Sequence, residues 1–246
     1  MPPGIRGGKE RGMELEAFGM MEFVGTAVLD TIGLVIANLD DTLRDQLGVP
    51  DHCRALGLIG SRTGAAGQAM AADEAVKGTN CLAVSVELPR DTKGWGGHGC
   101  LIVLGAPDVS DARRAVEIAL DLIGKFAGEV HISAAGHLEF AYSARAGEVL
   151  RQAFGAVEGM AFGFMAGSPA PIGLVMADRA MKAAPVQAVK VCTPSRGTSH
   201  SNEVILAVSG EAEAVRQCVM AGKTAGMALL RSMGSQPESP GAPYLV

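Results

Sequence analysis

Short apolar runs alternate with amphipathic segments along the chain, and glycine, proline or polar residues separate them. In the first half this pattern predicts four strands joined by helices. The predicted strands are Thr31–Leu39, Arg54–Ser61, Leu82–Leu88 and Gly99–Gly105. The predicted helices are Asp40–Leu47, Ala65–Thr79 and Ser110–Phe126. Asp40 and Ser110 are candidate N-terminal caps, and Gly48 ends the first helix.

The second half repeats the same order of elements. Its predicted strands are His137–Ser143, Gly159–Ala166, Gln187–Thr193 and Asn202–Gly210. Its predicted helices are Ala144–Phe154, Pro169–Ala183 and Ala212–Leu230. The last helix carries its apolar and small residues along one stripe, which indicates a packed face. The stripe comprises Val215, Cys218, Val219, Gly222, Gly226 and Leu229.

The two halves also match residue by residue. Shifting the chain by 105 positions gives 11 identities in the 34 positions from 72 to 105, and Asp73 and Lys77 fall on Asp178 and Lys182. Upstream, Leu43-Arg44 falls on Leu150-Arg151 after a further shift of two residues, and Gly48 falls on Gly155. Two copies of one domain explain this, whereas a solenoid needs at least three repeats.

The repeat predicts an α+β chain of two tandem domains of ferredoxin-like size. We place the first domain at residues 21–128 and the second at 129–234. Residues 1–20 form an N-terminal extension and residues 235–246 a C-terminal tail, and both are expected to be flexible because they are rich in polar residues, glycine and proline.

Composition narrows the function classes. A net charge of −5 without long basic runs argues against nucleic acid as a partner. No apolar run reaches the roughly 18–20 residues that span a bilayer, and the polar start lacks the apolar stretch of a secretory signal, so we expect a cytosolic protein without membrane contact. The five dispersed cysteines are expected to be buried, reduced thiols.

Several segments are candidate chemical sites. Gly222-Lys223-Thr224 matches the end of a phosphate-binding loop, but it lies inside a predicted helix. The motif also requires a glycine five residues before Gly222, and this chain has Gln217 there. The turn from Gly60 to Gly67 is a better anion-site candidate, since it follows a strand and opens a helix, although a plain tight turn is the stronger interpretation. The five histidines show no metal-binding spacing. Two alternatives stay open: a sensor that binds a metabolite between the domains, and an enzyme that uses the Gly60–Gly67 turn for a phosphorylated ligand.

Several segments resemble the PduB-type family of bacterial microcompartment shell proteins. They are EFVGTAVLDTIGLVIANLD, MAADEAVKGTN, ELPRDTKGWGGHG, SPAPIGLVMADRAMKAA, GTSHSNEVILAVSGEAEAVRQCVMAGK and PGAPYLV. The resemblance implies two fused, circularly permuted BMC domains. It also implies homotrimers shaped as pseudohexamers, which tile with other shell proteins around a propanediol-utilising or related aldehyde-generating pathway. On this basis we expect a structural protein without catalytic residues or cofactors, located in the cytoplasm in a microcompartment shell.

The resemblance also points to particular residues. Lys77 and Lys182 match the lysine that lies at the edge between neighbouring tiles in single-domain members. Two loops match the pore loop, and they are expected to lie at the trimer axis and to affect the passage of small polar metabolites. Their residues are Pro89, Arg90, Asp91, Thr92, Lys93, Gly94, Trp95, Gly96, Gly97 and His98 in the first loop and Pro194, Ser195, Arg196, Gly197, Thr198, Ser199, His200 and Ser201 in the second.

His98 and His200 are candidates for polar lining, and Trp95 is either a plug or a packed anchor. Neither loop contains a cysteine, which argues against the iron–sulfur cluster of some related proteins. Residues 1–20 are a candidate tether to encapsulated enzymes.

Overall fold

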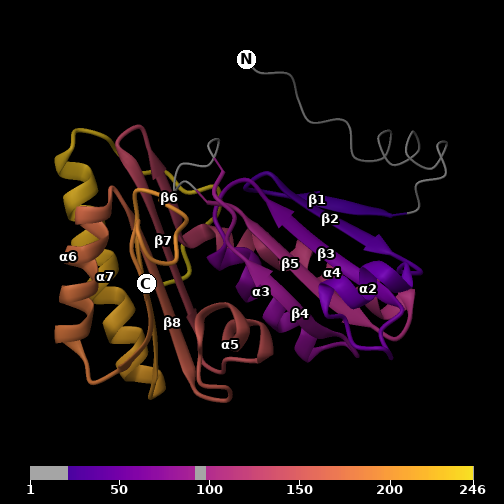
Figure 1. Cartoon of the computed structure of the whole chain (residues 1–246). Helices are drawn as coiled ribbons and strands as arrows, with labels where there is room; N and C mark the ends of the chain where they lie inside the picture. The colour runs from indigo at the N-terminus through magenta and orange to yellow at the C-terminus, as the bar shows by residue number, and fades with distance from the viewer. Residues whose placement is uncertain (1–21, 92–97, 246) are drawn as a thin grey trace.

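The computed structural model describes residues 22–91 and 98–245, and these residues form two antiparallel sheets with helices packed against them (Figure 1). The first sheet has the order β1-β2-β3-β5-β4 and the second β6-β7-β8-β10-β9. The strands of the first sheet are β1 (Phe23–Ala27), β2 (Thr31–Ile36), β3 (Ala55–Ser61), β4 (Leu82–Glu87) and β5 (Cys100–Ala106). Those of the second are β6 (Val130–Ser133), β7 (Gly136–Ser143), β8 (Ala161–Ser168), β9 (Gln187–Cys192) and β10 (Val204–Gly210). The identical strand order confirms the duplicated α+β architecture.

The helices repeat in the same way. The first domain carries α2 (Asp41–Leu47), α3 (Ala66–Lys77) and α4 (Val109–Phe126), and a short 3-10 turn η1 (Ala127–Glu129) follows. The second carries α5 (Glu148–Phe154), α6 (Ala170–Ala183) and α7 (Ala212–Ser232). In Figure 1, α6 and α7 cover one face of the second sheet, while α5 lies between the two sheets.

Two strands were missing from the expected set. β1 and β6 are short strands that pair with β2 and β7 in hairpins. β1 has only five residues and its pairing is interrupted between Phe23 and Gly25, while β6 has four residues. Such short runs give too little alternation for a pattern to be seen.

Helix ends follow local capping. The Asp40 carboxylate accepts a hydrogen bond from Leu43 N, and Gly48 ends α2 in the left-handed conformation at φ 66°, as expected. The expected cap Ser110 is wrong, because Asp108 accepts from the backbone N–H groups of Ser110 and Asp111 and the helix begins at Val109. The helix expected from Ala144 begins only at Glu148.

Each repeat uses glycine where a helix crosses its sheet. A Cβ atom at Gly57 would lie 2.9 Å from a methyl carbon of Val116 in α4. At Gly163 the same atom would lie 2.6 Å from a methyl carbon of Val219 in α7. Both helices therefore sit closer to their sheets than any side chain on the strand would allow.

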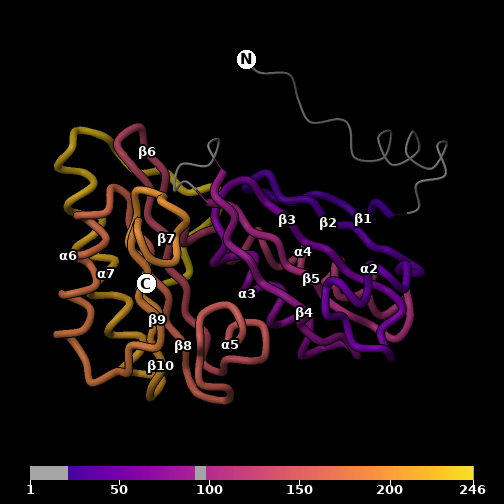
Figure 2. The backbone as a smooth tube through the Cα atoms, in the orientation of Figure 1, coloured from indigo at the N-terminus to yellow at the C-terminus, as the bar shows by residue number. Residues whose placement is uncertain are grey.

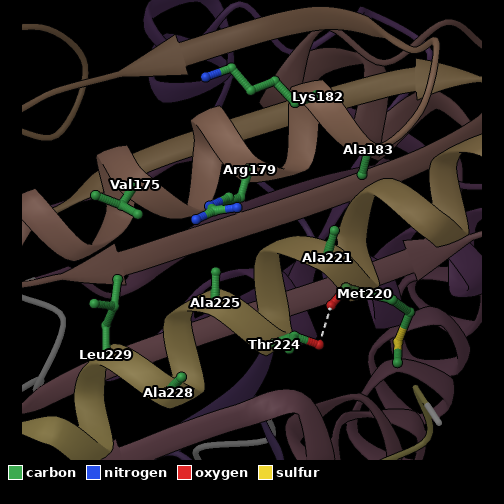
Figure 3. Close-up of a pocket in the computed structure, with 10 residues that line it drawn as sticks. All are labelled: Val175, Arg179, Lys182, Ala183, Met220, Ala221, Thr224, Ala225, Ala228 and Leu229. Carbon is green, nitrogen blue, oxygen red and sulfur yellow. Dashed lines mark hydrogen bonds between the residues drawn. The ribbon is translucent and has the colours of Figure 1, made fainter.

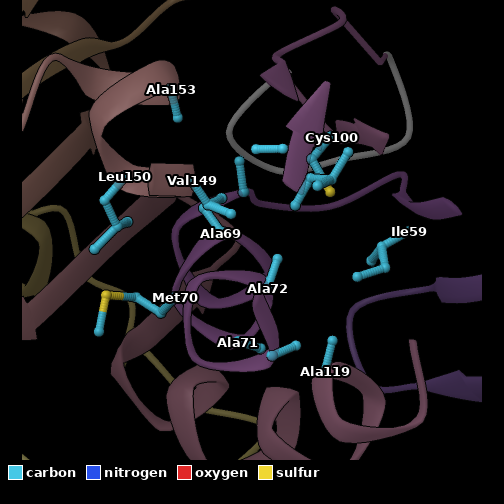
Figure 4. Packing of buried hydrophobic residues seen from close by; sticks show 14 of the residues in the cluster. Ile59, Ala69, Met70, Ala71, Ala72, Cys100, Ala119, Val149, Leu150 and Ala153 are labelled. Atoms are coloured by element: carbon cyan, nitrogen blue, oxygen red, sulfur yellow. The ribbon is translucent and has the colours of Figure 1, made fainter. Parts of the chain in front are cut away.

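The hydrophobic core of the first domain continues into the second. Figure 4 shows Ala69 of α3 beside Val149 of α5, and both belong with Ala72 and Leu150 to one buried cluster. We call the contact of α3 with α5 and β7 the internal seam. Through this contact the two domains share one hydrophobic core, so they are not separate domains joined only by a linker.

The segment after α7 differs from expectation. Residues 235–245, expected to be a flexible tail, pack against the second domain, where the C-terminal end lies in Figure 2. Ile132 and Glu238 exchange backbone hydrogen bonds, and the Leu245 side chain is buried. Because the segment is mostly polar, its sequence does not indicate these backbone hydrogen bonds or the burial of Leu245. Among the described residues no helix is long and apolar enough to cross a membrane.

Candidate functional site

The first expected axial loop is closed at its base by backbone pairing. Gly99 N donates to the carbonyl of Pro89 over 2.9 Å, and Arg90 forms a bridge with His98. Beside this base, the Arg62 guanidinium binds the Asp91 carboxylate with two hydrogen bonds of 2.8 Å. Positions 92–97, which include the expected plug or anchor Trp95, lie outside the described residues.

The second loop is a compact turn. Thr193 and Arg196 exchange backbone hydrogen bonds of 2.7 and 2.9 Å. Ser199 and His200 both adopt the left-handed conformation, at φ 51° and 65°, and both are exposed. Thr198 instead turns inward, where its hydroxyl donates to the Thr193 carbonyl. His200 therefore stays accessible for the expected polar lining.

His98 does not line an open surface in this chain. Its side chain is 1% exposed, and its Nδ1 lies 2.7 Å from the Glu203 carboxylate, at the end of the second loop. Its Nε2 lies 3.8 Å from Glu139 of β7. The expected lining role is wrong for His98, because the residue ties the ends of the two loops together inside the protein.

Glu139 is the centre of this buried group. Its carboxylate lies 2.8 Å from Nε2 of His137 and accepts hydrogen bonds from the backbone N–H groups of Ala65 and Ala66 at the start of α3. His98, His137, Glu139 and Glu203 are all buried, and we call them the His–Glu cluster. The cluster joins a strand of the second domain to a helix of the first.

This arrangement also fills the candidate anion site. The free N–H groups at the start of α3 are what would bind a phosphate. Glu139 already occupies them, and a Cβ at Gly64 would lie 2.6 Å from its carboxylate oxygen. The Gly60–Gly67 turn therefore binds an internal carboxylate instead of a ligand.

The second candidate, Gly222-Lys223-Thr224, lies inside α7, as predicted. Lys223 binds Glu129 over 2.7 Å and the Leu245 carbonyl over 2.6 Å. The lysine of this triplet thus anchors the C-terminal segment.

The cluster has unequal titration behaviour. Burial alone would raise the pKa of Glu139, but the charge and hydrogen bond of His137, with the charge of His98, lower it to about 2. Burial alone would lower the pKa of His98, but the hydrogen bond to Glu203 and the charges of Glu139 and Glu203 raise it above 6.5. The contacts within the cluster therefore favour the charged forms of both Glu139 and His98.

Raising the pH is expected to weaken the cluster. Because the folded pKa of His98 is raised, its stabilisation is complete below pH 6.5 and is lost as the pH rises through the folded value. Urea unfolding between pH 6 and 9 should show this loss for the natural chain. His98→Gln should be less stable at pH 6 and should lack this part of the pH dependence, so an equal slope in both proteins would contradict the assignment.

The two matching lysines lie in different surroundings. Lys77 Nζ binds Asp73, Glu74 and the carbonyl of Arg145 across the internal seam, at 2.7–2.9 Å. Lys182 Nζ binds only Asp178 of its own helix among the contacts described, and its side chain is largely exposed. Only Lys77 already meets a neighbouring domain in the single chain.

The sequence patterns above do not identify Glu139 and Glu203 as buried carboxylates. Glu139 stands in the segment HLEFAYS, between residues that face the core, and Glu203 directly precedes an apolar strand. A charged residue inside an apolar strand is a usable signal, because burial of a carboxylate requires partners. The identity of those partners depends on the fold.

The five cysteines all lie in the described part of the chain and are buried and free, as expected. Burial raises the pKa of Cys100 to about 12 and that of Cys218 to about 11. These thiols therefore stay protonated near neutral pH and behave as small apolar groups.

Comparison with known proteins identifies the family. A BMC domain model matches residues 161–236. The chain is 48% identical over 237 residues to the microcompartment shell protein PduB of Citrobacter freundii, covering 96% of this chain and 88% of that one. The structure is similar to EtuB from Clostridium kluyveri, with a TM-score of 0.88, 51% identity and coverage of 92% of this chain and 99% of that one. It is also similar to a trimeric shell protein PduB, with a TM-score of 0.87, 47% identity and coverage of 91% and 99%. The chain therefore belongs to the PduB-type family of bacterial microcompartment shell proteins.

Proposed function

We propose that this chain is a structural tile of a microcompartment shell, and that three copies form a six-sided trimer. The internal seam carries this proposal, because it fixes two equivalent domains side by side, as two adjacent positions of a ring would be. The likeness to a trimeric shell protein at 47% identity supports the count of three. Such trimers tile with other shell proteins into the facets that enclose the pathway.

A non-catalytic role is supported by how the chain uses its reactive groups. The Glu139 carboxylate occupies the better of the two candidate phosphate sites, at the start of α3. Cys100 and Cys218 are held as thiols by burial, so they do not supply a nucleophile. We therefore propose a chain without a resident cofactor.

The two axial loops are the proposed control point for small polar metabolites such as diols or glycerol. The second loop presents exposed polar groups at Ser199 and His200, and the first loop is anchored at its base by Arg62 and Asp91. The His–Glu cluster ties both loop ends together, so a rearrangement of one loop would be transmitted to the other. Residues 1–20 are the proposed tether to encapsulated enzymes of a propanediol-utilising or related aldehyde-generating pathway.

Assembly tests this proposal directly. Multi-angle light scattering should give the mass of three chains, and electron microscopy at high protein concentration should show sheets or tubes. Lys182→Ala is expected to reduce sheet formation severalfold while the trimer mass stays unchanged, because a flat-lying lysine stem at an edge contributes only to contacts between tiles. Lys125→Ala, at an exposed helix end, is the control. A monomeric mass for the natural chain would contradict the proposed function.

A further inference from the structure

The two domains differ in the side chains that stand between their long helices. α4 and α7 correspond with a shift of 103 residues, since the methyl groups nearest to the sheet glycines belong to Val116 and Val219. Along one side of α4 the side chains are large and are buried or partly buried in the core: Ile118, Leu122 and Phe126. The matching residues of α7 are Ala221, Ala225 and Leu229. Two of the three side chains that fill this space in the first domain are therefore reduced to a methyl group in the second.

A groove of about 780 Å³ between α6 and α7 lies at these positions, and we call it the helix groove. Its lining includes Ala221, Ala225 and Leu229 of α7. Along α6 it runs from Val175 to Lys182, which is about 11 Å at 1.5 Å per residue. A concave, mostly apolar surface of this size is a candidate binding site.

A cation stands at the edge of this apolar lining. Arg179 of α6 occupies the position of Glu74 in α3, and Figure 3 shows its side chain extending into the space beside Ala225. Glu74 binds Lys77 in the first domain. Among the residues that the structure describes, no ion pair or hydrogen bond engages the Arg179 guanidinium. An occupant of the helix groove should therefore be apolar and should carry a carboxylate.

One segment outside the described residues has this composition. Residues 14–21 read ELEAFGMM, with two carboxylates among four large apolar side chains. Residues 1–13 differ, because they carry three basic residues and only one acidic residue. Eight residues are long enough to follow the helix groove from end to end, since even a helix of eight residues is about 12 Å long.

The repeat indicates where this segment begins. Within the chain, α4 runs through η1 directly into β6, so the end of α4 lies beside the start of β6. β1 is the counterpart of β6, since each pairs in a hairpin with the next strand of its sheet. In the proposed trimer the second domain of one copy meets the first domain of the next in the same way, so the end of α7 lies beside the start of β1 of the neighbour. Residues 14–21 end one residue before β1 and thus begin near Leu229, at one end of the helix groove. Figure 1 shows β1 and α6 on opposite sides of the molecule, so this groove belongs to the neighbour.

We propose that residues 14–21 of one copy bind in the helix groove of the neighbouring copy. This inference rests on the proposed trimer. The apolar side chains of the segment cover Ala221 and Ala225, and its carboxylates bind Arg179. Residues 1–13 project beyond the groove and remain available as the tether to encapsulated enzymes.

Protection from proteolysis tests the inference in the full-length trimer. A glutamate-specific endopeptidase should cut after Glu14 and Glu16 about tenfold more slowly in the natural protein than in Arg179→Glu, because cleavage needs the unbound segment. Ala221→Ile with Ala225→Leu should lose the protection equally, since these side chains fill the helix groove as in the first domain. Cleavage after Glu10, outside the bound segment, should be equally fast in all three proteins. Arg114→Glu, an exposed charge reversal on α4, is the matched control and should keep the protection.

Photo-cross-linking identifies the surface that the segment binds. A photoreactive phenylalanine analogue at position 18 should give covalent dimers on a denaturing gel, with the cross-linked peptide mapped to α7 of the second chain. Arg179→Glu should reduce the dimer yield about tenfold, and adding Glu14→Lys and Glu16→Lys to that variant should restore it, because the charges are again opposite. The same analogue at position 5 should give no product with α7.

The outcomes separate this inference from the trimer on which it rests. A natural chain that is trimeric by light scattering, but shows neither protection of the segment nor a cross-link to α7, would overturn the bound segment and leave the trimer intact. Cross-links confined to a single chain would also overturn it. A monomeric natural chain would overturn both the trimer and the bound segment.

Discussion

Replacing Glu139 by alanine is expected to lower the free energy of unfolding by about 3–5 kcal/mol, the typical loss when one member of a buried ion pair is removed. Its carboxylate is buried and binds His137, lies 3.8 Å from His98, and accepts two backbone hydrogen bonds at the start of α3. The alanine variant would leave the His98 charge with only Glu203 and would leave the α3 donors without a partner. Urea unfolding at pH 7 measures the loss.

Two controls separate charge from packing. Glu158→Ala removes a largely exposed carboxylate and should change the free energy of unfolding by less than about 1 kcal/mol. Glu139→Gln keeps the shape of the side chain but removes its charge. Because the folded pKa of Glu139 is about 2, the natural chain gains stability from this group above about pH 4.5 and loses it as the pH falls toward 2. The glutamine variant should lack that part of the acid transition, and a loss below about 1 kcal/mol for Glu139→Ala would contradict the role assigned to the cluster.

The architecture was predictable because the duplication gives two independent sequences for the same set of helices and strands. The match of Asp73 and Lys77 to Asp178 and Lys182 identified two copies of one domain, so each helix or strand was supported by its counterpart. The cap was predicted correctly at Asp40, but it was placed at Ser110 instead of Asp108, two residues earlier. Prediction failed at Gly147, where the capping carboxylate comes from Asp73, distant in sequence.

The surroundings of the candidate site residues were less predictable, because their partners are also distant in sequence. His98 has the sequence context of a polar loop residue, and its burial arises because Glu139 of β7 and Glu203, just before β10, come together around it. Charged side chains become buried only when partners compensate the loss of water, and those partners are set by tertiary structure. The resemblance to shell proteins supplied the loops and edge lysines, and it carried no information about the cluster that joins them.

Deleting residues 239–246 is expected to lower the free energy of unfolding by about 3 kcal/mol, since a buried carboxylate would lose its backbone donors and a buried leucine would be removed. Glu129 is fully buried and accepts hydrogen bonds from Tyr244 N and Leu245 N over 2.7 and 2.6 Å. Lys223 binds both Glu129 and the Leu245 carbonyl. A flexible tail, as its composition suggested, would make the same deletion neutral.

A point variant at Gly128 tests whether the packed position of the tail is what stabilises the fold. A Cβ at Gly128 would overlap the carbonyl oxygen of Ala242, so Gly128→Ala should displace the tail without shortening the chain. In the full-length protein this variant should cost a similar amount to the deletion. In the shortened chain the same substitution should be nearly neutral, because the atom it collides with is gone. Equal costs in both backgrounds would show that Gly128 acts independently of the tail, and urea unfolding of the four proteins decides between the two results.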